Sequence, residues 1–174
     1  MKTHALLRAA VLLALVLPSV NATTITYNIL FSGLQSVPAN GSTATGNATV
    51  TVNDTLDTVA VTLSFAGLTG GNASAAHIHC CVPTNANGPV VIPFTGFPNT
   101  TSGTYSNTFT GVDPVNIAGI EAGQAYINIH NATFPGGEIR ADILAAPVPE
   151  PTSIGLTILA LSAAAALRRR LRQS

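Results

Sequence analysis

Charged residues are scarce in this chain of 174 residues, and their distribution excludes one class of partner. They make up 8% of the sequence, and six of the seven basic residues lie near the two ends. The stretch 23–147 therefore keeps Arg140 against six acidic side chains, a formal net charge of about −5. Nucleic-acid binding needs a basic patch, so this segment is not expected to bind nucleic acid. Cations or basic partners suit it better.

Tryptophan is absent, and aromatic residues make up only 5% of the chain. Aromatic faces are the usual stacking platforms of sugar sites, so a polysaccharide-binding module of a biofilm matrix is disfavoured. The sequence also has no Gly-x-Ser-x-Gly elbow, no phosphate-binding loop and no HExxH helix. It therefore predicts a binding or structural protein rather than an enzyme, and it assigns no catalytic residue.

No segment between the ends shows a sustained helical period, except for one short turn near 115–120. Instead, polar and apolar residues alternate in short runs that glycine and proline separate, which is typical of half-buried strands. About eight such strands predict an all-β domain over 23–146, an antiparallel β-sandwich with Greek-key connections of the immunoglobulin-like or superoxide-dismutase-like kind. The expected strands are 24–31, 44–52, 59–65, 76–80, 89–94, 103–109, 125–130 and 138–144.

The first 22 residues have the three parts of a secretory signal peptide. Lys2 and Arg8 form a positive region, a short apolar run follows, and small residues precede the expected cleavage after Ala22. The apolar run is short for a membrane span, which needs about 20 residues. We therefore expect a signal peptidase to remove residues 1–22, and the rest of the chain to be exported.

The segment 147–174 has the organisation of a sorting tail. The two prolines of its Pro149-Glu150-Pro151 step lack an N–H and restrict the residues before them, so they mark a boundary after the folded domain. An apolar run at 152–167 follows, and as a helix it rises roughly 24 Å, a little less than the ~30 Å of the hydrocarbon layer. The arginines beyond it would stay on the cytoplasmic side. The motif is Val148, Pro149, Glu150 and Pro151, and the basic cluster is Arg168, Arg169 and Arg170.

This tail closely resembles the PEP-CTERM sorting signal of bacterial exported proteins. The resemblance implies recognition by an exosortase-type membrane transpeptidase, with processing near the Pro-Glu-Pro motif. It also implies a transient stay of the short transmembrane helix 152–167 in the inner membrane. The final location would then be the cell surface or the extracellular matrix.

Three histidines of the exported segment are candidates for a metal site. His77 and His79 are two apart in an expected strand, so their side chains point to the same face. His130 ends another strand, and the three imidazoles would converge if these strands are neighbours. Such a set suits zinc or copper, with Glu138 or Asp142 as a further ligand or as an acceptor for a ring N–H. The alternative is a structural role at a strand end, and a copper or zinc redox enzyme is a further possibility.

Cys80 and Cys81 follow His79 directly and are the only cysteines. Adjacent Cα atoms are about 3.8 Å apart across a trans peptide, less than the usual ~4.4–6.8 Å of a disulfide. Export into an oxidising compartment nevertheless favours a disulfide. The sequence therefore leaves three possibilities, in this order: a vicinal disulfide, metal binding beside the histidines, and bonds to other chains.

Several blocks across residues 25–144 resemble the CHRD domain, first described in the animal protein chordin. The resemblance implies an extracellular domain without an established activity in bacteria and without a catalytic set to carry over. Within the last block, glycines give a tight turn before the final strand, on which Glu138 and Arg140 would form a structural charge pair. The blocks are 33–38, 44–46, 67–69, 76–79, 87–91, 125–130 and 135–140.

Overall fold

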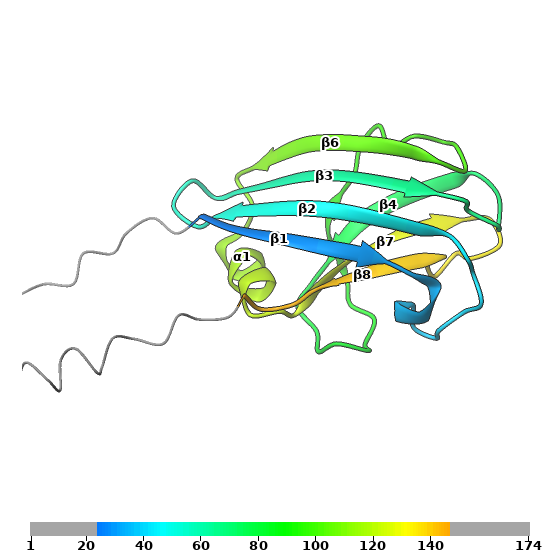
Figure 1. Cartoon of the computed structure of the whole chain (residues 1–174). Helices are drawn as coiled ribbons and strands as arrows, with labels where there is room; N and C mark the ends of the chain where they lie inside the picture. The colour runs from blue at the N-terminus through cyan, green and yellow to red at the C-terminus, as the bar shows by residue number, and fades with distance from the viewer. Residues whose placement is uncertain (1–23, 147–174) are drawn as a thin grey trace, which may run out of the picture.

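The computed structural model describes residues 24–146. The signal peptide predicted at 1–22 and the sorting tail predicted at 147–174, with its helix at 152–167, lie outside the described residues. Within 24–146, no helix is long and apolar enough to cross a membrane. The two ends of the described chain lie at the same end of the domain as the helix α1 (Pro114–Glu121) (Figure 1).

Residues 24–146 contain eight strands in two antiparallel sheets of four strands each, which confirms the predicted all-β sandwich. The two sheets face each other across the core (Figure 1). A short 3-10 helix, η1 (Gly33–Gln35), follows the first strand. The first sheet has the order β1 (Thr24–Phe31), β2 (Thr45–Asn53), β3 (Thr58–Ala66) and β6 (Gly103–Thr110). The second has the order β5 (Val90–Pro93), β4 (Ala73–His79), β7 (Ala125–Asn131) and β8 (Ile139–Ile143).

Alternation along each strand sends one set of side chains into the core and the other outward. Inward residues such as Val50, Leu63, Ile78 and Ile127 are buried. The outward face of the first sheet is built mainly from Thr, Asn and Ser, whose side chains bond across the strands, and Leu30 of β1 is also exposed there. These cross-strand pairs are Thr26–Thr51, Asn28–Thr49, Thr24–Asn53, Thr62–Ser106 and Asn47–Ser64.

The outward face of the second sheet is partly covered by residues 80–89, which we call the covering loop. Its Gly88 N–H donates to the hydroxyl of Tyr126 on β7, and its Ala86 carbonyl accepts from Arg140 on β8. Arg140 also bonds through its backbone to Ser32, which follows β1. The second sheet therefore carries polar side chains beneath a loop, and this is where the candidate site lies.

Candidate metal centre

Strands β4 and β7 bring the three histidines together. They are neighbours in the second sheet, with His77 opposite Asn128, His79 opposite Tyr126, and His130 opposite Ala75. Because alternate residues of a strand share a face, His77, His79 and His130 all lie on the outer face of this sheet. The predicted convergence of the three imidazoles required β4 and β7 to be neighbours, and the structure has them paired.

The imidazole rings form a compact cluster. His77 Nδ1 lies 3.2 Å from His130 Nε2, and one nitrogen from each ring lies within 4.8 Å of the other two. Nitrogens that share a tetrahedral zinc ion at about 2.0–2.1 Å lie roughly 3.4 Å apart. The closest pair already matches this spacing. No pair of these nitrogens has to close by more than about 1.4 Å.

Backbone carbonyls fix the orientation of two of the rings. His79 Nδ1 donates to the Gly88 carbonyl and His130 Nδ1 donates to the Pro135 carbonyl, each at 2.8 Å. A carbonyl can only accept, so the hydrogen of each neutral ring is on Nδ1 and the lone pair is on Nε2. Metal-binding histidines are usually held in this way, with the second ring N–H bonded to a carbonyl or carboxylate.

His79 Nε2 is buried and has no hydrogen-bond partner among the described residues. The residue is 8% exposed, and its ring stacks on Tyr126 with the centroids 4.7 Å apart. Buried polar atoms in proteins are nearly always paired, because an unpaired one costs about 1–3 kcal/mol. A lone pair held in place without a partner therefore points to a ligand.

The cluster favours neutral imidazoles. Burial, together with smaller effects of the neighbouring His130 and His79, lowers the pKa of His77 to about 4. Burial also lowers the pKa of His130, against the hydrogen bond to Pro135, which raises it. Both rings are thus uncharged at neutral pH, and the neutral imidazole is the form that binds a metal ion.

Arg140, the one basic side chain within residues 24–146, lies next to the cluster beneath the covering loop. Its guanidinium carbon lies 3.5 Å from the centre of the Tyr126 ring, and its Nε donates to Asp142 Oδ1 at 2.7 Å. Arg140 was predicted to form a charge pair with Glu138, and this prediction is wrong, because Arg140 pairs with Asp142. Residues 140 and 142 share a face of β8, whereas Glu138 precedes that strand.

Glu138, predicted as a further metal ligand, lies outside the histidine cluster. Its carboxylate is fully buried and accepts from Ser42, Thr69, Gly70 and Asn131. Burial alone would raise the pKa of Glu138, but the bonds from Ser42, Thr69 and Gly70 bring it below the ordinary value. The ionised carboxylate therefore joins two loops that are distant in sequence to the end of β7.

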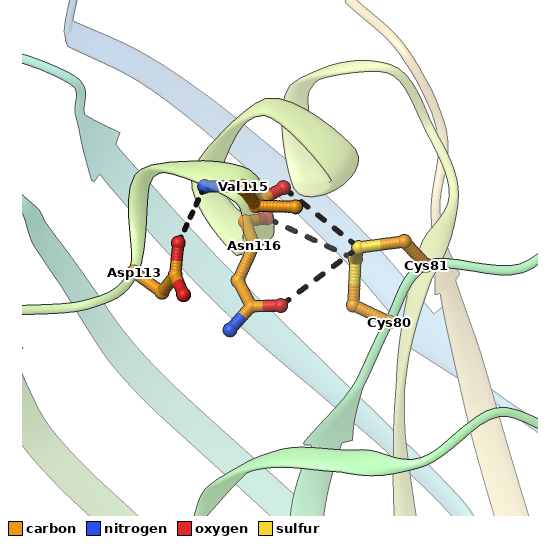
Figure 2. The surroundings of a disulfide bond; sticks show 5 residues. All are labelled: Cys80, Cys81, Asp113, Val115 and Asn116. Atoms are coloured by element: carbon orange, nitrogen blue, oxygen red, sulfur yellow. Dashed lines mark hydrogen bonds between the residues drawn. A yellow bond between two sulfur atoms is a disulfide. The ribbon is translucent and has the colours of Figure 1, made fainter.

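Cys80 and Cys81 are joined by a vicinal disulfide that packs against the start of α1 (Figure 2). Their sulfur atoms lie 3.8–3.9 Å from oxygen atoms of Val115 and Asn116. A disulfide sulfur has no hydrogen to donate, so these are packing contacts. Asp113 caps the helix by accepting from the Val115 N–H at 2.8 Å. The end of β4, next to His79, is thus held against α1.

Sequence reasoning missed Asn128 and Tyr126 as members of the site. The alternation that placed His130 outward also places residues 126 and 128 on that face, so a signal was present. The Gly88 and Pro135 carbonyls had no such signal, because every residue has a backbone carbonyl.

Comparisons with known proteins agree with this architecture. The family model of the CHRD domain matches residues 27–143, which include all three histidines. The model of the PEP-CTERM protein-sorting motif matches residues 147–170. No curated protein and no solved structure matches the chain. The sorting motif marks a protein that is exported and sorted by an exosortase to the cell surface or the exterior. The chain belongs to the CHRD domain family and is an exported protein sorted by an exosortase.

Proposed function

We propose that the exported domain is a binding protein that holds a transition-metal ion, Zn²⁺ or copper, between His77, His79 and His130. The observation that carries this proposal is the buried, unpartnered Nε2 of His79. Its lone pair is held by the bond from Nδ1 to Gly88, and the other imidazoles offer nitrogens within 4.8 Å. Neutral imidazole is a ligand that suits both zinc and copper.

The proposal includes the route of the protein to its place of action. A signal peptidase would remove residues 1–22, and the helix at 152–167 would hold the chain in the inner membrane until exosortase processing. The mature domain would then act at the cell surface or in the extracellular matrix. Its acidic balance supports this role, because negative side chains raise the local concentration of cations.

Elemental analysis of the purified full chain tests the metal site. The protein is incubated with Zn²⁺ or Cu²⁺, freed of excess ion, and compared with His79→Ala and His130→Ala. Asn28→Ala is the matched control, because it removes a polar side chain from the outer face of the other sheet. Circular dichroism verifies that each variant is folded.

We expect about one ion per chain in the wild type and the control, and a loss of that ion in both histidine variants. The bound ion should also raise the free energy of unfolding by about 2.7 kcal/mol at a free concentration 100 times the Kd. A folded wild type without stoichiometric metal would refute the proposal. Full retention of metal by folded His79→Ala and His130→Ala would refute it equally.

A further inference from the structure

Asn128 lies at the centre of the polar face that carries the histidines. In the register of the second sheet it is opposite His77 on β4 and opposite Arg140 on β8. Its side chain is only 4% exposed, so both ends of its amide need partners. What these partners are decides which end of the amide faces the imidazoles.

One end of the amide has an unambiguous partner. The Nδ2 group donates to the carbonyl of Gly136 at 3.2 Å, and a carbonyl can only accept. The amide is therefore oriented with its oxygen toward the histidine cluster. There, Asn128 Oδ1 lies 2.8 Å from His130 Nε2.

This contact joins two atoms that both carry lone pairs. Neutral His130 has one ring hydrogen, whereas the Pro135 carbonyl and Asn128 Oδ1 both only accept, each at 2.8 Å from a ring nitrogen. We assign the hydrogen to Nδ1, where it is donated to Pro135, as His79 Nδ1 donates to Gly88. His130 Nε2 therefore has no hydrogen to offer to Asn128 Oδ1, and two acceptors at 2.8 Å repel each other unless a cation lies between them. Ligand atoms that share a tetrahedral zinc ion are roughly 3.4 Å apart, so a metal ion bound by both atoms removes the repulsion once they separate by about 0.6 Å.

The turn Pro135-Gly136-Gly137 orients both the ring of His130 and the amide of Asn128. Pro135 supplies the carbonyl for His130, and Gly136 supplies the carbonyl for Asn128. Gly137 has a φ of +112°, and a Cβ there would lie 2.8 Å from Asn128 Nδ2. Glycine is required on both counts, because other residues rarely adopt this conformation and would collide with the amide.

We propose that Asn128 Oδ1 is the fourth ligand, which completes a site of three imidazole nitrogens and one amide oxygen. This inference rests on the proposed function of the histidine cluster. Four protein ligands close the coordination of a tetrahedral ion, as in structural zinc sites, whereas catalytic sites keep one position open. The hard oxygen ligand also favours a divalent ion over Cu⁺, which prefers sulfur ligands.

Zinc affinity and a cobalt spectrum test the inference on the purified full chain. Zn²⁺ affinity is measured by competition with a chromogenic chelator for the wild type, Asn128→Ala, Asn128→Asp and His79→Ala. Asn28→Ala is again the control. Co²⁺ is then bound in place of zinc, because its visible absorption depends on the identity and number of the ligand atoms.

We expect Asn128→Ala to weaken zinc binding by about 10- to 100-fold. Asn128→Asp should bind at least as tightly as the wild type, because it keeps an oxygen in place and adds a negative charge. It should also shift the Co²⁺ absorption, which a residue that only packs against the site would not do.

Failure of this inference differs from failure of the proposed function. If folded His79→Ala binds zinc as the wild type does, the histidine site itself is wrong. If His79→Ala loses zinc while folded Asn128→Ala keeps the wild-type affinity, only the role of Asn128 is overturned. Should Asn128→Ala not fold, an unchanged Co²⁺ spectrum in Asn128→Asp overturns that role by itself.

Discussion

Replacing Glu138 with alanine should strongly destabilise the folded domain. Its buried carboxylate accepts from the hydroxyls of Ser42 and Thr69, from the backbone N–H groups of Thr69 and Gly70, and from the amide of Asn131. Alanine removes every acceptor at once. Glutamine keeps the shape, but its NH₂ group would face donors where the carboxylate offered an oxygen.

The magnitude follows from the donors that are left unpaired. A hydrogen bond to a charged group contributes about 1.5–3 kcal/mol, and a buried donor without an acceptor costs about 1–3 kcal/mol. Water can reach part of these loops, so we expect Glu138→Ala to cost about 3–5 kcal/mol and Glu138→Gln about 2–3 kcal/mol. Against a typical total stability of about 5–15 kcal/mol, the alanine variant should melt roughly 10–20 °C lower.

The effect should depend on pH, because the pKa of Glu138 is lower in the folded state than its ordinary value. Such a group contributes stability that is fully present above the unfolded pKa of about 4.3 and is lost as the pH falls through the folded pKa. Protonated glutamate resembles glutamine. The difference in stability between the wild type and Glu138→Gln should therefore shrink in acid.

Urea denaturation followed by far-UV circular dichroism, from pH 7 to pH 3, measures both quantities. A cost below about 1 kcal/mol for Glu138→Ala at pH 7 would show that the hydrogen-bond network does not stabilise the domain. A gap between the wild type and Glu138→Gln that stays constant down to pH 3 would show that folding does not lower the pKa of Glu138.

Three further predictions concern other parts of the chain. Burial and the nearby Asp54 raise the pKa of Glu121, so its ionised form destabilises the fold at neutral pH. Glu121→Gln should therefore raise the urea midpoint at pH 7, and this gain should disappear in acid. A lower midpoint at pH 7 would contradict this. A Cβ on Gly119 would overlap both sulfur atoms of the disulfide, so Gly119→Ala should cost about 1–3 kcal/mol by calorimetry; an unchanged melting temperature would argue against the packing on α1. Deletion of residues 149–174 should abolish surface location and processing in cell fractionation, and unchanged location and size would mean that the tail is no sorting signal.

Most of the strands were predictable from the sequence because alternation is a local property. The first strand, Thr24–Phe31, has the predicted bounds, and Thr58–Ala66 extends the predicted strand 59–65 by one residue at each end. The short helix Pro114–Glu121 also begins within one residue of the predicted turn. These elements follow from the side chains of a few neighbouring residues.

The candidate site was predictable only in part. Alternation puts His77 and His79 on one face, but the approach of His130 depends on the pairing of β4 with β7, which local patterns do not determine. The predicted partner of Arg140 was Glu138, and it was wrong. The carboxylate of Glu138 instead accepts hydrogen bonds from donors in loops about 70 and 100 residues earlier in the chain. Contacts at such separations have no signature in a single sequence.

The Thr, Asn and Ser side chains on the outer face of the first sheet have a consequence for life outside the cell. Hydroxyl and amide groups neither titrate nor attract counterions, so the hydration of this face does not depend on acidity or on the screening of charges by salt. A protein kept soluble by charge repulsion would precipitate more readily in brine or near its isoelectric point. We therefore expect this surface to help keep the domain dispersed in surroundings whose ionic composition the cell does not regulate.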